Sequence, residues 1–176
     1  MQILYFNKFE NGSMDATKKR IGYCRDMARK ILHDTKMMMM PVPVEEIAKH
    51  YGFQIKFLDQ PPDKFSGILL RDKKAIGINK HHHPVRQRFS LGHELGHYFL
   101  DHPDASEEIP DEDGIEKRKL YETEADEFAA ELLMPRELLK AALNEGADVE
   151  TLRTKFQVSR DVVAIQLMKH GFLMKV

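Results

Sequence analysis

The chain lacks the features that would place it in a membrane or in an oxidising compartment. It has one cysteine among 176 residues, Cys24, so it can form no internal disulfide. No run approaches the roughly 20 apolar residues of a membrane-spanning helix. The apolar start, residues 1–6, is too short for a signal peptide. We therefore expect a soluble cytoplasmic protein without membrane partners.

The sequence also lacks an excess of charge of either sign. Its 27 basic and 28 acidic residues give a formal net charge of −1, which removes any global electrostatic argument for nucleic-acid binding. Hydrophobic residues make up 42% of the chain and charged residues 31%, as in globular rather than disordered proteins. This length suits one compact domain, so we expect a single domain over residues 1–176.

Two local concentrations of residues stand out against this average composition. Six of the nine histidines lie within residues 81–102, and residues 101–150 hold 17 acids against 5 bases. A group of histidines followed by an acidic segment is therefore the first feature to explain.

Apolar periodicity and turn residues predict an α+β fold, with several helices around one small sheet of three or slightly more strands. One strand is expected over residues 53–57, and two more, 65–70 and 75–79, form a hairpin around the charged turn 71–74. Helices are expected over residues 16–36, 44–51, 84–100, 116–134, 136–144, 148–156 and 160–170. Ser159 is the expected N-cap of the last helix. We expect residues 104–116 to form an acidic loop, and residues 136–176 to form a helical cap.

The segment 93–97 has the sequence His-Glu-Leu-Gly-His and matches the H-E-x-x-H motif. Positions i and i+4 of a helix differ by about 40°, so His93 and His97 project from one face and can bind one metal ion. In this motif the carboxylate of Glu94 reaches the water on the metal and acts as general base. The motif therefore predicts a catalytic zinc site.

Two glycines, Gly92 and Gly96, interrupt the helix that carries this motif. Each costs about 1 kcal/mol relative to alanine inside a helix. Close packing of another backbone against the glycines would compensate for that cost, so we expect another part of the chain to approach closely here.

A catalytic zinc ion usually has three protein ligands, and the third must come from elsewhere. The metzincin extension is excluded, because Leu100 and Pro103 occupy the positions of its glycine and histidine. Asp101 lies at the end of the expected helix. His102 lies about 140° around the helix from His97, so it could contribute only if the helix ended before it.

The helix expected over 116–134 offers a second pair of side chains at i and i+4, Glu122 and Asp126. One carboxylate could bind the metal while the other accepts the free N–H of a ligand histidine. Taken alone, the pair is better explained as an acidic cluster favoured by the helix dipole, but beside an H-E-x-x-H helix the ligand interpretation is the better one. Glu124 points about 200° away from Glu122, and we expect it to be solvated. An apolar stripe would pack this helix against the histidine helix: Ala125, Phe128, Ala129, Leu132 and Leu133.

These two motifs, in this order, resemble the ImmA/IrrE family of zinc metallopeptidases. The first spans residues 86–97, Arg-Gln-Arg-Phe-Ser-Leu-Gly-His-Glu-Leu-Gly-His. The second spans residues 122–135, Glu-Thr-Glu-Ala-Asp-Glu-Phe-Ala-Ala-Glu-Leu-Leu-Met-Pro. Residues 42–48 and the hairpin before the histidine helix are similar to the family in a less specific way.

The resemblance implies a minimal gluzincin-like α+β fold with zinc as cofactor. It implies His93, His97 and Glu122 as metal ligands, Glu94 as catalytic base, and Asp126 as the residue that supports a ligand histidine. It further implies a protein substrate, a partner transcriptional repressor of the helix-turn-helix type, in a phage, mobile-element or stress-response system. The sequence leaves open whether manganese replaces zinc.

The donor that stabilises the developing oxyanion also stays open, among Tyr98, Tyr121 and the run His81–His83. The histidine run precedes Pro84, and we expect it to form a solvated loop that at most rims the cleft. The histidines in other expected helices are predicted to be surface or boundary residues: His33, His50 and His170.

The C-terminal segment 148–170 supports a different hypothesis, because its apolar rhythm is similar to a helix-turn-helix. The chain would then be a DNA-binding or repressor-binding regulator with a structural or vestigial metal site. Residues 151–176, however, contain five bases and one acid without an arginine cluster. The last helix is also too apolar for an exposed recognition helix, so we do not expect direct nucleic-acid binding. A repressor-binding protein that does not cleave is a third hypothesis, against which the complete ligand set and Glu94 argue.

Overall fold

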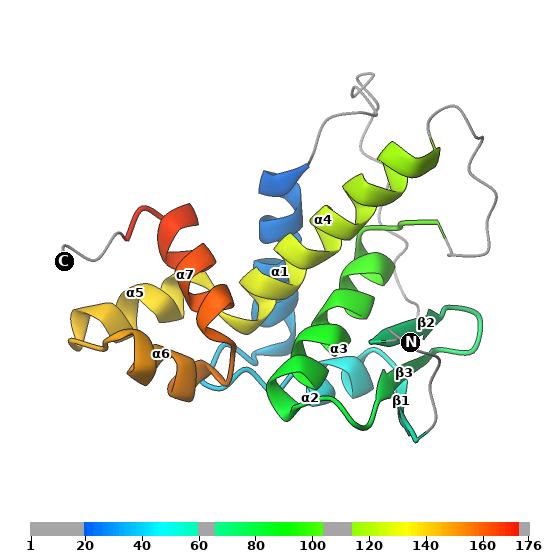
Figure 1. Cartoon of the computed structure of the whole chain (residues 1–176), viewed down its shortest axis with the longest axis horizontal. Coiled ribbons are helices and arrows are strands. Elements are labelled where there is room, and N and C mark those ends of the chain that lie inside the picture. The colour runs from blue at the N-terminus through cyan, green and yellow to red at the C-terminus, as the bar shows by residue number, and fades with distance from the viewer. Residues whose placement is uncertain (1–19, 60–65, 104–113, 173–176) are drawn as a thin grey trace.

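The computed structural model describes residues 20–59, 66–103 and 114–172, which contain seven helices and one three-stranded sheet (Figure 1). The helices are α1 (Ile21–Thr35), α2 (Val44–His50), α3 (Pro84–Phe99), α4 (Gly114–Leu133), α5 (Arg136–Asn144), α6 (Val149–Phe156) and α7 (Arg160–Lys169). The strands are β1 (Gln54–Leu58), β2 (Gly67–Leu70) and β3 (Ala75–Asn79). The predicted α+β class is confirmed. Most of the expected acidic loop and the expected start of the first helix at residue 16 lie outside the described residues.

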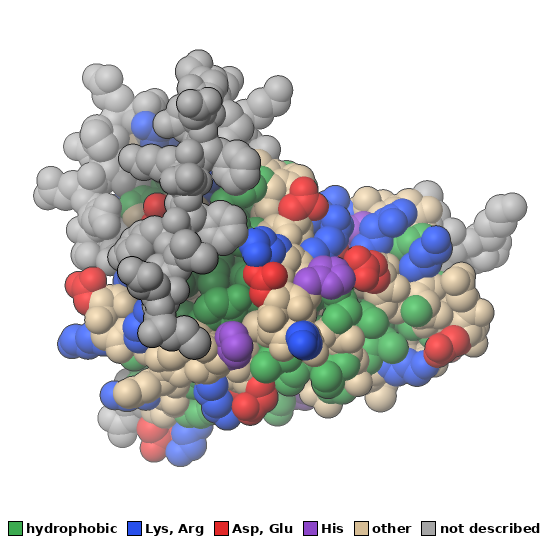
Figure 2. All heavy atoms as spheres, turned by 180° about the vertical axis from the view of Figure 1, so that it is seen from behind, with side chains coloured by type: hydrophobic (Ala, Val, Ile, Leu, Met, Phe, Trp, Pro, Cys, Tyr) green, Lys and Arg blue, Asp and Glu red, His purple; other side chains and the backbone are tan. Residues whose placement is uncertain are grey.

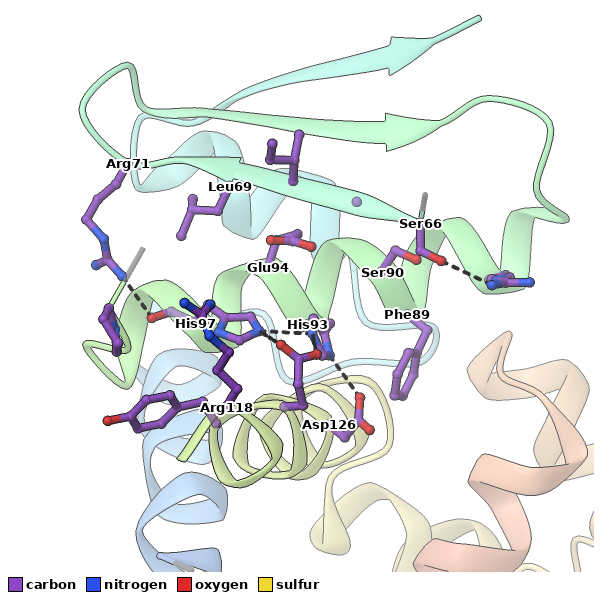
Figure 3. Close-up of a pocket in the computed structure, with 16 residues that line it drawn as sticks. Ser66, Leu69, Arg71, Phe89, Ser90, His93, Glu94, His97, Arg118 and Asp126 are labelled. Atoms are coloured by element: carbon purple, nitrogen blue, oxygen red, sulfur yellow. Dashed lines mark hydrogen bonds and ion pairs between the residues drawn. The ribbon is translucent and has the colours of Figure 1, made fainter. Parts of the chain in front are cut away.

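The sheet has the strand order β1-β3-β2. Strands β2 and β3 form the predicted antiparallel hairpin, with Leu70 paired to Ala75 around the charged turn. Strand β1 pairs with β3 in parallel, a pairing between segments separated in sequence. In the described part of the chain β2 is an edge strand, and it lies alongside α3 (Figure 3).

Helices α3 and α4 approach closely because the two glycines of α3 face alanines of α4. A Cβ atom at Gly96 would lie 3.1 Å from both the Cα and the carbonyl oxygen of Ala125. At Gly92 it would lie 3.4 Å from the Cβ of Ala129. The expected close packing at the two glycines is confirmed. It brings the histidine face of α3 against the acidic start of the second motif.

Helix α1 and the residue before it, Arg20, pack on the other side of α4 (Figure 1) through ion pairs in register. The pairs are Arg20–Glu124, Arg25–Glu127 and Arg29–Glu131, with N···O distances of 2.6, 3.2 and 2.7 Å. All three glutamates are buried. Removing one partner of a buried pair costs about 3–5 kcal/mol, so these pairs fix the rotation of α4 about its axis.

The expectation that Glu124 is solvated is therefore wrong, since its side chain is only 1% exposed. The physical reason is that α4 is buried on two faces. Helix α3 covers one face, and α1 covers the face that carries Glu124.

Helices α5 to α7 pack against the C-terminal end of α4 (Figure 1). Leu139, Leu152 and Phe156 join the hydrophobic core, and Gln166 of α7 donates a hydrogen bond to the carbonyl of Met134 at 3.0 Å. Ser159 is the predicted N-cap of α7, because its hydroxyl accepts the N–H of Val162. Among the described residues, no helix has the length and apolar character required to cross a membrane.

Candidate metal centre

Helix α3 presents His93 and His97 on one face (Figure 3), and α4 brings Glu122 to them. The Nε2 atoms of the two histidines lie 3.0 Å apart. The carboxylate oxygens of Glu122 lie 3.2 Å from Nε2 of His93 and 3.4 Å from Nε2 of His97. One potential ligand atom from each residue lies within 4.8 Å of the others, and no other group of this kind occurs in the described part of the chain. Two imidazoles and one carboxylate form a typical set of catalytic zinc ligands.

Asp126, one turn beyond Glu122, contacts the far side of His93. Its Oδ1 lies 2.8 Å from Nδ1 of the imidazole (Figure 3). Burial lowers the pKa of His93, but hydrogen bonds to Asp126 and Glu122 outweigh burial and raise it to about 10. Hydrogen bonds from the two histidines hold the pKa of Glu122 well below its usual range. A cluster that stabilises a proton this strongly also suits a divalent cation, which competes with that proton.

His97 has a different partner on its far side. Its Nδ1 lies 3.1 Å from Nδ1 of His102, whose Nε2 lies 3.0 Å from a carboxylate oxygen of Glu124. Burial lowers the pKa of His102 to about 4, so its imidazole is neutral near pH 7. The turn after α3 produces this arrangement, because Asp101 adopts a left-handed conformation with φ 55°.

The structure therefore separates the alternatives for a third ligand. His102 lies behind His97 and outside the group of potential ligand atoms. Asp101 has a fully exposed side chain that lies 3.8 Å from Arg71. Glu122 is the residue that the fold brings to the two histidines.

Glu94 points away from α4, into the space between α3 and the edge strand β2 (Figure 3). Burial raises the pKa of its carboxyl group, while a hydrogen bond from the backbone of Leu69 opposes that rise. A Cβ atom at Gly67 would lie 2.8 Å from Oε1 of Glu94. Strand β2 thus holds the carboxylate in place, and any side chain at residue 67 would displace it. Sequence reasoning missed Gly67, because a single glycine at the start of a strand carries no signal of its own.

A pocket of about 530 Å³ opens over these side chains (Figure 3). Its lining includes Ser66, Gly67, Ile68 and Leu69 beside Glu94, and Tyr121, Glu122 and Asp126 beside the histidines. Three arginines also line it: Arg71, Arg86 and Arg118. Of the candidate oxyanion donors, Tyr121 lines the pocket, whereas Tyr98 hydrogen-bonds with Lys74 outside the lining.

The histidine run His81–His83 lies in the turn before α3, as expected, and outside the lining of the pocket. His83 caps α3, since its Nδ1 accepts the N–H of Val85 at 3.3 Å. His33 and His50 are exposed, as predicted. His170 is a boundary residue, as predicted, although its side chain is only 3% exposed and lies 3.0 Å from Glu131.

The segment 148–170 forms α6 and α7, and its basic side chains are engaged in ion pairs. Arg153 and Arg160 both pair with Glu150, and Lys169 pairs with Glu127. Most of the apolar residues that suggested a recognition helix are buried: Val162, Val163 and Leu167. On the described part of the face opposite to the view of Figure 1, acidic and basic side chains are interspersed (Figure 2).

Similarity to known proteins shows the family and the fold of the chain. The Peptidase M78 family model, the IrrE N-terminal-like domain, matches residues 48–168. Comparison with curated proteins gives no match. Among solved structures, a Mycobacterium tuberculosis transcriptional regulator is similar, with a TM-score of 0.61 and 17% sequence identity. The match covers 83% of this chain and 46% of that one, so the chain spans less than half of the regulator's length, and the likeness is one of fold alone. Because the family model covers more than half of the sequence, the chain belongs to the Peptidase M78 family of IrrE N-terminal-like domains.

Proposed function

We propose that the chain is a zinc-dependent endopeptidase that cleaves a partner transcriptional repressor of the helix-turn-helix type. The observation that carries the proposal is the convergence of His93, His97 and Glu122, with Glu94 beside them on the same helix. Membership of the family supports a metallopeptidase-type role. The similarity of fold to a transcriptional regulator supports a regulatory setting.

The residues of the site fit the ion, because they supply two imidazole nitrogens and one carboxylate at one point. Zinc bound there would polarise the scissile carbonyl and lower the pKa of water. Glu94 is the general base: its carboxylate accepts a proton from the attacking water and returns it to the leaving amine. Burial raises the pKa of this carboxyl group, which improves it as a proton donor in the second step.

Two further groups have proposed roles around the reacting carbonyl. Asp126 accepts the Nδ1–H of His93 and so fixes the orientation of that imidazole. Tyr121 lines the pocket and is the proposed hydrogen-bond donor to the developing oxyanion.

Strand β2 offers a binding place for the substrate main chain. It is an edge strand of the described sheet, and it lines the pocket beside Glu94. An extended peptide can add to such an edge as a further strand through main-chain hydrogen bonds. We therefore propose that the substrate binds as an extended segment, such as a linker, rather than as a folded element.

A regulator that acts by binding DNA through residues 148–170 is the alternative function. The ion pairs of Arg153, Arg160 and Lys169 and the burial of Val163 in α7 favour the peptidase. Non-specific DNA binding relies on basic side chains that neutralise phosphates, and here acidic neighbours already pair with them.

The proposal is tested by incubating the zinc-loaded protein with the helix-turn-helix regulator encoded beside it. Cleavage is measured by mass spectrometry for the wild type, Glu94→Gln and Glu137→Gln. Glu137 is an exposed glutamate outside the pocket, so its variant is the matched control. Cleavage by the wild type and the control, with none by zinc-loaded Glu94→Gln, supports the proposal. Equal cleavage by Glu94→Gln, or no cleavage by any of the three, contradicts it.

A further inference from the structure

We propose that His102 is a positioning residue for the metal site, which fixes the tautomer and ring orientation of His97 through a buried relay that ends at Arg20. This inference rests on the proposed function, because it takes His97 as a metal ligand. The relay consists of His97, His102, Glu124 and Arg20, which come from α3, the turn after it, α4 and the residue before α1.

The two candidate ligand histidines are supported in different ways. His93 contacts the carboxylate of Asp126 directly, and that carboxylate is 59% exposed. His97 reaches a carboxylate only through His102, and the side chains of His102 and Glu124 are both 1% exposed. The residues behind His97 are thus shielded from solvent, whereas the residue behind His93 is not. We therefore expect His102 and Glu124 to contribute more to the rigidity of the site than Asp126 does.

The contacts of the relay are compatible with one set of proton positions. If Nε2 of His97 offers its lone pair to a metal, Nδ1 carries the proton and donates it to Nδ1 of His102 at 3.1 Å. A neutral His102 then carries its proton on Nε2, which donates to Glu124 at 3.0 Å. The reverse tautomers would place a lone pair of His102 against the carboxylate and a proton of His97 at the metal. The geometry therefore orients His97 for metal binding.

Further contacts hold both Glu124, at the far end of the relay, and His102 in its middle. Glu124 accepts hydrogen bonds from Nε and Nη2 of Arg20 at 3.1 and 2.6 Å, and from its backbone N–H at 2.9 Å. Arg71 donates to the carbonyl oxygens of His97 and His102 at 3.2 and 2.6 Å. The ring of Tyr121 packs on that of His102, with centroids 4.7 Å apart. His102 is thus held by its side chain, its backbone and its ring face.

The first test measures the zinc affinity of the purified full chain by competition with a chelator. His102→Phe keeps a ring and removes both hydrogen bonds, so zinc should bind about 10–100-fold more weakly, as is typical when the group behind a ligand is lost. His102→Gln should recover most of that affinity, because its amide oxygen can accept from His97 and its amide nitrogen can donate to Glu124.

The chain offers a matched control at the other end of α4. His170 pairs with buried Glu131 at 3.0 Å, as His102 pairs with Glu124. His170→Phe removes the same kind of imidazole–carboxylate pair far from the pocket, so its zinc affinity should equal that of the wild type. An equal loss in His102→Phe and His170→Phe would mean that the effect is one of general stability, and would overturn the relay.

The second test needs no variant. Long-range ¹H–¹⁵N correlation spectra of the zinc-loaded wild type should place the proton of His97 on Nδ1 and that of His102 on Nε2. A proton on Nδ1 of His102, or wild-type zinc affinity in His102→Phe, overturns the relay and leaves the proposed peptidase intact. A wild type that binds no zinc overturns both.

Discussion

Replacing Gly67 by alanine tests how the edge strand β2 controls Glu94. The backbone of Gly67 lies outside the left-handed region, so alanine causes no backbone strain there. Its Cβ, however, would lie 2.8 Å from Oε1 and 3.1 Å from Cγ of Glu94. Because ordinary contacts begin near 3.4 Å, the carboxylate must retreat by about 0.6 Å.

The size of this shift sets the expected effect on catalysis. Misplacing a reacting group by 1 Å costs about 100-fold in rate, so a shift of about 0.6 Å predicts a loss in kcat of roughly tenfold. That loss corresponds to about 1.4 kcal/mol in the activation barrier. The zinc content should not change, because His93 and His97 face α4, which carries Glu122, rather than β2 (Figure 3).

The assay is the initial rate of repressor cleavage at saturating substrate, with zinc content measured on the same samples. Gly77→Ala is the matched control, since its Cβ would meet the side chains of Ile68 and Leu58 at 3.0 Å within the same sheet. It perturbs the packing of the sheet without contacting Glu94. Unchanged kcat in Gly67→Ala, or an equal loss in both variants, would refute the reasoning.

Four further substitutions test the packing of α4, two of them beside the site and two at its other end. Gly96→Ala pushes α3 away from the α4 backbone, which a Cβ would approach to 3.1 Å. The Gly96→Ala variant should lose about 1–3 kcal/mol of unfolding free energy in urea and should bind zinc more weakly. Gly92→Ala should lose less, because its Cβ would lie at an ordinary contact distance of 3.4 Å from Ala129. A larger loss in Gly92→Ala than in Gly96→Ala would be inconsistent with the fold. Arg29→Met deprives buried Glu131 of its arginine, and should cost about 3 kcal/mol in urea unfolding; a loss below about 0.5 kcal/mol would argue against a buried pair. Burial lowers the pKa of His170 from 6.5, so the unfolded chain binds a proton that the folded chain does not, and stability should fall as pH falls below 6.5. His170→Phe should therefore show a shallower decrease between pH 7.5 and 5.5, and an unchanged slope would contradict this sign.

The features that the sequence predicted well are local ones. His93 and His97, like Glu122 and Asp126, are paired at i and i+4, and that spacing places two side chains on one face wherever the helix lies. The charged turn between two apolar runs predicted the hairpin of β2 and β3. The glycines of α3 also carried information, because their cost inside a helix implied a close neighbour.

The features that the sequence did not predict depend on long-range packing. The angle of about 200° between Glu124 and Glu122 on the helix predicts that Glu124 points away from the metal site, but it does not show what covers that side. Here α1 covers that face with arginines in register. The position of His102 depends on the left-handed turn at Asp101, and the role of Gly67 depends on how β2 docks against α3. Neither has a periodic signature, so both required the structure.

The proposed catalysis requires one metal ion bound between His93, His97 and Glu122. Anomalous diffraction at the zinc absorption edge, from crystals of the zinc-loaded chain, measures this without any substrate. We expect a single strong anomalous peak within bonding distance of both Nε2 atoms and the Glu122 carboxylate, and no peak there in His93→Ala. A peak located elsewhere, or none at this site with zinc in excess, would contradict it.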